Sequence, residues 1–299
     1  ARLDMARFYM ANGLGPEANA MIEMMEQDDP LIGQKSEFRA LKGAAKFLNG
    51  QYDEADRLLN DPRFGDLTEI KLWRAVNSAA RGRPNEGARD LMDSIQLLEK
   101  YPSELLMRLG PGAAEQALIV KNPKAGMDIV NKILETPDAP KNKLLDVQYL
   151  KGLFEQEAGQ FDQAIATWDQ VAEGDNRKAR AHAIFDRTDL LLKLKRLTVD
   201  AAIDQLEKLR FAWRGDDFEL AVLRRLGNLQ VEGKHFRDAL KTLRQAAIFF
   251  PNNPATPAVT EKMHKTFEDL YLGDDINNIS AIKAVALYDE FRELTPAGD

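Results

Sequence analysis

The chain alternates between stretches in which large apolar residues recur every three or four positions and short polar turns that contain glycine. Residues 144–158 and 218–232 show this spacing clearly, and it is typical of amphipathic helices. Each is followed by a polar turn, GQFD or GKHF, and then by a second stretch with the same spacing. The pattern therefore predicts pairs of helices joined by tight turns, with negligible strand.

Three of the expected second helices carry one signature, in which an aromatic residue precedes an alanine by three positions and a large apolar residue follows it by four. The three sets are Tyr52/Ala55/Leu59, Phe161/Ala164/Trp168 and Phe236/Ala239/Leu243. Alignment of the whole chain on this alanine gives the anchors Ala18, Ala55, Ala88, Ala125, Ala164, Ala202, Ala239 and Ala284. The first and last anchors lie 266 residues apart over seven intervals, an average of 38, which predicts eight repeats.

Small residues recur twelve positions before the anchors, and prolines recur twelve positions after them. The earlier positions are Ala6, Gly43, Val76, Ala113, Gly152, Leu190, Gly227 and Leu272, of which five are glycine or alanine. The later positions include Pro30, Pro137, Pro251 and Pro296. A small residue on the first helix and an alanine on the second predict a close crossing of the two helices. Proline, which has no N–H to donate, predicts the end of each second helix.

The small, aromatic, alanine and proline positions resemble those of the tetratricopeptide repeat (TPR), a helix–turn–helix unit of about 34 residues. The resemblance is clear in the segments 1–30, 36–62, 144–176 and 218–251, with divergent repeats between them and an irregular insertion at 252–283. It implies an all-α, right-handed α-solenoid of about eight helix pairs that spans residues 1–299 as a single array.

Residues 206–227 and 286–296 also resemble segments of long TPR proteins of alphaproteobacteria. Because long TPR proteins often serve in bacterial envelope assembly, this likeness favours the periplasm or cell envelope over the cytoplasm. The chain opens at Ala1 within an already periodic segment, so we expect it to be a fragment of a longer protein.

Composition narrows the functional classes. The 299 residues are 44% apolar and 30% charged, which provides enough apolar side chains for a large core. The formal net charge of −7 argues against a general nucleic-acid-binding protein, which needs a basic surface. No apolar run approaches the roughly 18 residues that a membrane span requires. The lack of cysteine excludes disulfides, thiolate metal sites and a cysteine nucleophile, and we expect no metal and no cofactor.

Catalytic signals are weak along the chain. Three histidines lie far apart and form no metal-binding motif, namely His182, His235 and His264. Three acidic pairs could supply the carboxylates of a glycoside hydrolase, namely Asp28/Asp29, Asp216/Asp217 and Asp274/Asp275. Each pair lies at an expected helix boundary, where aspartate caps free backbone N–H groups. Capping is therefore the preferred interpretation, and we expect no enzymatic activity.

In TPR proteins, the first helices line a concave groove that is the usual site of peptide binding. If the small residue is counted as position eight, side chains at positions two, five, nine, twelve and thirteen face the groove. These positions select the candidate partner-binding residues Trp73, Asn77, Arg81, Tyr149, Gln156, Arg187, Arg224, Asn228 and Glu232. Arg224 and Asn228, one turn apart, resemble half of the family's clamp for a peptide C-terminal carboxylate.

A basic–aromatic segment also stands out in this acidic chain and contains Lys208, Arg210, Phe211, Trp213 and Arg214. It suits the binding of an acidic segment or a polysaccharide, and equally a packed junction between repeats.

These observations favour a non-catalytic scaffold that binds a protein or peptide partner or assembles a larger complex. One alternative is a carbohydrate-active hydrolase on an all-α scaffold, with paired carboxylates. A second is a structural module that associates with other copies of itself, because neither end of the sequence resembles a polar capping helix.

Overall fold

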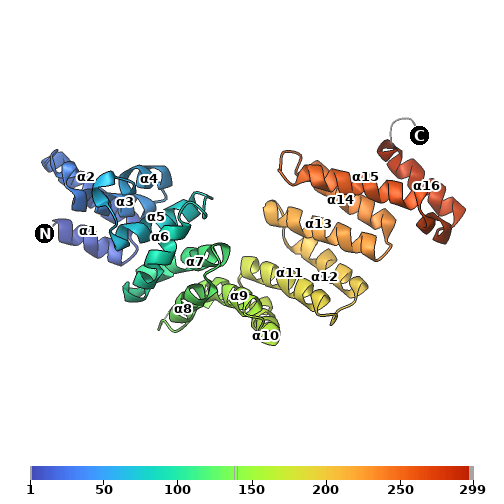
Figure 1. Ribbon diagram of the computed structural model, residues 1–299, viewed down its shortest axis with the longest axis horizontal. Helices are drawn as coiled ribbons and strands as arrows, with labels where there is room; N and C mark the ends of the chain where they lie inside the picture. The colour runs from blue at the N-terminus through green and yellow to red at the C-terminus, as the bar shows by residue number, and fades with distance from the viewer. Residues whose placement is uncertain (1, 138, 140, 296–299) are drawn as a thin grey trace. The chain divides into compact units, whose positions relative to one another are not determined.

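The computed structural model describes residues 2–137, 139 and 141–295. Within these ranges the chain forms sixteen α-helices and no strand. The chain divides into two compact units, Ala1–Arg180 (unit 1) and Ala181–Asp299 (unit 2). Consecutive helices within each unit pack side by side as pairs (Figure 1). The expectation of an all-α helical-repeat solenoid with about eight helix pairs is therefore confirmed.

Unit 1 holds five helix pairs. They are α1 (Arg2–Ala11) with α2 (Gly15–Asp28), α3 (Ser36–Leu48) with α4 (Tyr52–Leu59), α5 (Thr68–Ala80) with α6 (Ala88–Ser94), α7 (Ser103–Ile119) with α8 (Pro123–Leu134), and α9 (Lys141–Glu157) with α10 (Phe161–Ala172). Short 3-10 helices occupy three connections, at Ile32–Gln34, Pro62–Phe64 and Ile95–Lys100.

Three further pairs follow, and the division between the units falls within the first of them. They are α11 (Arg177–Lys193) with α12 (Val199–Ala212), α13 (Asp217–Glu232) with α14 (Phe236–Phe249), and α15 (Thr256–Leu272) with α16 (Ala281–Phe291). Short 3-10 helices lie at Asp274–Asn278 and Arg292–Leu294.

Prolines at the ends of second helices behave as the sequence predicts. Pro30, Pro137 and Pro251 follow the last residues of α2, α8 and α14 by two or three positions, whereas Pro296 lies outside the described residues. Residues 252–283, in contrast, were expected to be an irregular insertion and contain the helix α15. Pro257 lies in the first turn of α15, where proline is tolerated because its missing N–H has no helical partner there.

Three pairs cross where a glycine of the first helix meets a large side chain of the second. A methyl group added at Gly43 would lie 2.8 Å from Cδ2 of Leu59, and one at Gly227 would lie 2.8 Å from Cδ2 of Leu243. The equivalent methyl at Gly152 would collide with the indole of Trp168, which is fully buried. The large residue of the signature therefore occupies the space that the missing side chain leaves.

The turn between the two helices repeats with the same backbone in seven pairs. One residue in each turn has a left-handed φ, namely Gly13, Gly50, Gly82, Lys121, Gly159, Lys195 and Lys234. The next residue donates its N–H to the carbonyl five positions earlier at 2.7–2.9 Å, which satisfies an otherwise unpaired group at the helix end. This turn residue marks the repeat independently of side-chain patterns.

The repeated turn corrects the sequence alignment in three pairs. The residue seven positions before the left-handed one is Ala6, Gly43, Ala75, Ala114, Gly152, Thr188 and Gly227, which is small in every case. The small-residue positions that the sequence alignment assigned to Val76, Ala113 and Leu190 are therefore one residue too late, one too early and two too late, respectively. Gly87 confirms the shift, because a methyl added there would lie 2.8 Å from Cα of Ala75. In the last pair, Leu272 is 74% exposed and takes no part in a crossing.

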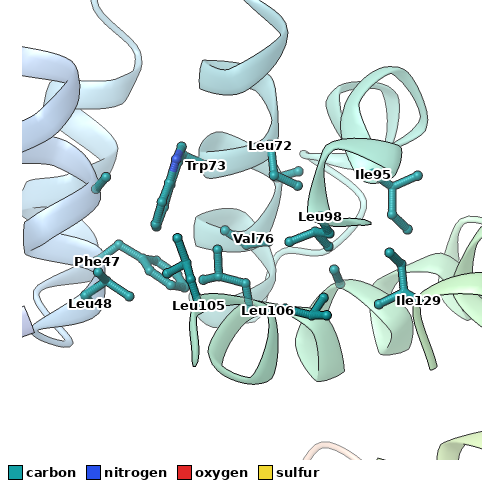
Figure 2. Close-up of a cluster of buried hydrophobic side chains, with 14 of the residues drawn as sticks. Phe47, Leu48, Leu72, Trp73, Val76, Ile95, Leu98, Leu105, Leu106 and Ile129 are labelled. Carbon is teal, nitrogen blue, oxygen red and sulfur yellow. The ribbon is translucent and has the colours of Figure 1, made fainter. Parts of the chain in front are cut away.

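Apolar side chains from both helices of each pair form the cores. One continuous cluster in unit 1 runs from Ala6 to Phe154, and two clusters lie in unit 2. Figure 2 shows part of the unit 1 cluster, where Phe47 of α3 and Trp73 of α5 approach Leu105 of α7. These contacts join successive repeats and thereby hold the first helices in order.

The crossing at Gly152 yields a stability prediction. Gly152→Ala should lower the free energy of unfolding by about 1–3 kcal/mol, because the added methyl overpacks the crossing against Trp168. Gly112→Ala is the matched control, since Gly112 lies in α7 with no atom near its missing methyl. The control should raise the stability by about 0.5–1 kcal/mol. Chemical denaturation checks both values, and a stabilised Gly152→Ala would contradict the crossing.

The left-handed turn residue yields a second prediction. Lys195→Gly should raise the free energy of unfolding by about 0.5–1 kcal/mol, because lysine is strained at a φ of 57° and glycine is not. Lys265→Gly, at an exposed position inside α15, should lower it by about 1 kcal/mol. Thermal and urea unfolding of the two variants should therefore shift in opposite directions. Shifts of the same sign would mean that the Lys195 turn has another backbone conformation.

Candidate functional site

The first helices of the successive pairs in unit 1 line an open pocket of about 450 Å³, which we name the Trp73 pocket. Its walls come from α1, α3 and α5 and from the connection between α4 and α5. The apolar lining includes Met10, Leu41, Phe64, Leu67, Ile70 and Trp73. Such a volume, lined mainly by apolar side chains, is in the range of protein pockets that bind small groups.

Small residues on α3 create the space in this pocket. Ala40 and Ala44 are one turn apart, so they lie on the same face of α3, and both line the pocket. Trp73 forms a rigid wall, because it is only 4% exposed and its ring packs 5.7 Å from that of Phe47 (Figure 2). Leu67, in contrast, is 58% exposed and offers its side chain to a bound molecule.

The charged groups at the rim of the Trp73 pocket are already engaged within the chain. Arg7 of α1 forms an ion pair with Glu37 of α3. The Tyr101 hydroxyl donates to Oε1 of Glu69 at 3.1 Å. Burial and the adjacent Glu69 carboxylate both raise the pKa of Tyr101, so this phenol stays protonated at neutral pH. The pocket therefore offers an apolar surface with a rim whose charged groups are paired or hydrogen-bonded within the chain.

A second concavity of about 410 Å³ lies one turn further along the same helices. Phe47 and Val76 line it, and they follow Ala44 and Trp73 of the first pocket by three residues. Arg108 and Glu115 of α7 complete the lining with charged side chains. Its surroundings raise the pKa of the Glu115 carboxyl, chiefly by burial in the concavity and also through the like charge of Asp146. Lys178 acts in the opposite direction. This second pocket is therefore the more polar one.

The structure places the unit 1 candidates in different surroundings. Trp73 is in the wall of the Trp73 pocket. Asn77 is fully buried, and its Nδ2 donates to the carbonyl of Tyr52 at 3.1 Å. Because Ala75 is the small residue, Asn77 lies one position beyond the groove face. Gln116 lies at the same repeat position and donates to the carbonyl of Pro84 at 2.7 Å, so both amides fix the turn of the preceding pair.

The remaining candidates are dispersed. Arg81 pairs with Asp53 at 3.0 Å and with Asp56 at 2.7 Å. Tyr149 and Gln156 are half-buried on α9, and the carbonyl of Tyr149 accepts a hydrogen bond from Nε1 of Trp168 at 3.2 Å. None of these three lines the Trp73 pocket.

Four candidates lie on the first helices of unit 2. Arg187 is half-buried on α11, whereas Arg224, Asn228 and Glu232 are exposed on α13. The side chains of Arg224 and Asn228 make no hydrogen bond or ion pair with any other described residue. They stand one turn apart on one face, so the two side chains are available to the same molecule.

Other groups singled out by sequence have structural partners. Asp216 caps α13 by accepting from the N–H groups of Phe218 and Glu219, as expected for an acidic residue at a helix boundary. His182 stacks on Phe218 at 3.9 Å, and Nε2 of His235 lies 2.9 Å from Oδ1 of Asp200. No cluster of three His, Asp or Glu residues suited to a metal ion occurs in the part of the chain that the structure describes.

No helix among the described residues has the length and apolar character needed to cross a membrane.

The basic–aromatic segment splits into a packed part and an exposed part. Trp213 joins the core beside Phe218, with ring centroids 6.2 Å apart, and its Nε1 donates to Oδ1 of Asp216 at 2.8 Å. Phe211 is 63% exposed, with the guanidinium groups of Arg210 and Arg214 at 4.9 and 5.9 Å from its ring. The segment is therefore both a repeat junction and an open surface.

Sequence reasoning missed most of the Trp73 pocket. The groove positions, counted on α1 and α3, select nine residues, of which Arg7, Met10, Glu37, Ala40 and Ala44 line the pocket. Phe64 and Leu67 belong to an irregular connection and have no repeat position, so periodicity carries no signal for them.

Comparison with known proteins adds to the description of the fold. No protein-family model matches the sequence, and a search of curated proteins gives no match. Among solved structures, the chain is similar to the apo form of the quorum sensor NprR from B. thuringiensis, with a TM-score of 0.67 and 11% identity over 98% of this chain and 92% of NprR. It is also similar to a tetratricopeptide repeat protein from Parabacteroides merdae, with a TM-score of 0.54 and 12% identity over 88% of this chain and 97% of the other.

At sequence identities this low, the similarity shows a shared fold and carries no information about a shared activity. Together with the repeated crossing and turn, these likenesses show that the chain has a TPR-like fold, an all-α solenoid of helix pairs.

Proposed function

We propose that the chain is a non-catalytic protein-interaction scaffold that binds an apolar segment of a partner peptide or protein at the Trp73 pocket. The observation that carries this proposal is an open, apolar pocket on the first helices, the face that TPR proteins use for peptide binding. The fold is similar to that of NprR, a quorum sensor.

The chemistry of the pocket favours an apolar anchor on the partner. Ala40 and Ala44 leave room for a Leu-, Met- or Phe-sized side chain against the rigid face of Trp73. Burial of such a side chain contributes about 1.5–3 kcal/mol before the entropy of association is subtracted. Because Arg7 and Glu37 neutralise each other at the rim, the partner needs no compensating charge there.

Truncation of the exposed wall tests the proposal. Peptides selected from a random library on the intact chain should bind Leu67→Ala at least tenfold more weakly, about 1.4 kcal/mol, because Leu67 contacts the bound apolar side chain. Leu31→Ala is the matched control, since Leu31 is 66% exposed and lies outside the pocket. Neither change should shift the unfolding free energy by more than about 0.5 kcal/mol.

A variant that fills the Trp73 pocket with a larger side chain provides a test that does not depend on Leu67. Ala40→Trp should block binding by occupying the pocket. Fluorescence anisotropy with the selected, labelled peptides gives the affinities. If the peptides bind wild type, Leu67→Ala and Ala40→Trp equally well, the Trp73 pocket is not the binding site.

Arg224 and Asn228 provide a separate proposed contact in unit 2. The planar guanidinium donates two parallel hydrogen bonds to a carboxylate, and an amide one turn away donates a third. Neither side chain is engaged with another described residue, so binding a carboxylate there breaks no existing bond. The ligand chemistry proposed for this position is the C-terminal carboxylate of a peptide.

Amidation of the peptide C-terminus tests this contact. Selected peptides with a free carboxylate should bind wild type about tenfold more tightly than their amidated forms, and Arg224→Ala should abolish the difference. Thermal stability should stay nearly unchanged, because Arg224 is exposed and unpaired within the described structure. Equal affinities of both peptide forms for wild type would remove Arg224 and Asn228 from the site.

A further inference from the structure

Three large apolar side chains are exposed at the C-terminal ends of two successive second helices. Phe211 lies near the end of α12 and is 63% exposed, while Ile248 and Phe249 end α14 and are 65% and 54% exposed. Phe211 follows the buried Ala202 by nine residues, and Ile248 follows the buried Ala239 by nine. The repeat therefore brings these side chains to equivalent positions in neighbouring pairs.

Hydrogen bonds place both helix ends beside the start of α13. The chain that leaves α12 is fixed by Trp213, which donates to Asp216, the N-cap of α13. The chain that leaves α14 is fixed by Asn253, whose Nδ2 donates to Oδ1 of Asp217 at 2.8 Å. The ends of α12 and α14, which carry Phe211 and Phe249, consequently lie at the same end of unit 2 as the first turn of α13. We call Phe211, Ile248 and Phe249 the helix-end patch.

Cations surround Phe211. The guanidinium groups of Arg210 and Arg214 lie within 6 Å of its ring. Lys208 and Arg214 form no ion pair with any described residue. Glu207, the acidic group bonded to Arg210 at 3.0 Å, also accepts from Gln230. The patch thus combines exposed apolar area with two cations, Lys208 and Arg214, that form no ion pair within the described chain.

We propose that the helix-end patch binds an acidic segment of a partner protein that also carries apolar side chains. Apolar groups of the partner cover Phe211, Ile248 and Phe249, and its carboxylates pair with Lys208 and Arg214. The site is distinct from the Trp73 pocket, because it lies on second helices in unit 2 and shares no residue with that pocket.

The charges around the patch favour a short acidic segment over a polyanionic surface. Asp204, Asp216 and Asp217 are exposed nearby, and the whole chain carries a net charge of −7. A nucleic acid or an anionic bilayer presents charge over a wide area and would meet these carboxylates as well as the cations. A peptide places its few carboxylates only where Lys208 and Arg214 lie.

A pair of matched peptide libraries tests the proposal on the intact chain. One library randomises Asp, Glu, Leu, Phe and Gly, and the other replaces the acidic residues by Lys and Arg. The acidic library should yield binders whose affinity falls about tenfold in Phe211→Ala and in Arg214→Ala, and falls further in high salt for wild type. Phe8→Ala, a matched change of a 59% exposed phenylalanine on α1, should leave the affinity unchanged.

Three results would overturn the proposal. The first is equal enrichment from the basic library. The second is acidic binders that keep their affinity for Phe211→Ala and Arg214→Ala. The third is binding of phosphatidylserine vesicles or duplex DNA that is lost in these variants while acidic peptides fail to bind. Melting curves of each variant confirm that its fold is intact, which is expected because both side chains are exposed.

Discussion

The rest of the structure depends on the close crossing of the two helices within each pair. At Gly43, Gly152 and Gly227 the first helix has no side chain, and the large residue of the second helix fills that space. This contact fixes both the distance and the angle between the helices, because neither glycine nor its large neighbour can shift without a collision or a cavity. The left-handed turn residue seven positions later then sets where the second helix begins.

The crossing determines which side chains of the first helix remain open. With the small residue turned toward the second helix, the opposite face of α1, α3 and α5 is left to line the Trp73 pocket. A ring contact from Phe47 to Trp73 at 5.7 Å holds the neighbouring first helices α3 and α5 together. A second, from Trp73 to Tyr101 at 6.4 Å, joins α5 to the connection that precedes α7. The apolar pocket is therefore a consequence of repeat packing with small side chains on one helix. The helix-end patch arises differently, from large side chains placed just beyond the last packed turn of α12 and α14.

The sequence predicted the helix pairs wherever one strong signature marked the crossing, as at Gly152, Ala164 and Trp168. The alignment misplaced the crossing in α5 and α7 because it required an alanine on the second side of the crossing, whereas Gly87 and Gly126 make the close contacts one position from Ala88 and Ala125. In α11 the position moved by two residues because α12 begins four residues after the turn residue Lys195, and not two as in the clearest pairs. A shift of one residue rotates a helix face by about 100°, which is why Asn77 was assigned to the groove and is instead buried. The role of Lys121, Lys195 and Lys234 had no signal in the sequence, because lysine gives no indication of a left-handed φ.

The central claim is that the first-helix face of unit 1 binds partners through the Trp73 pocket. The most direct measurement is a methyl NMR titration of the intact chain with a peptide selected on it, with methyl groups of methionine, leucine and isoleucine observed. The account predicts that shift changes concentrate at Met10, Leu41, Leu67 and Ile70, which line the pocket. Changes confined to methyl groups of the second helices, with these four unaffected, would contradict it.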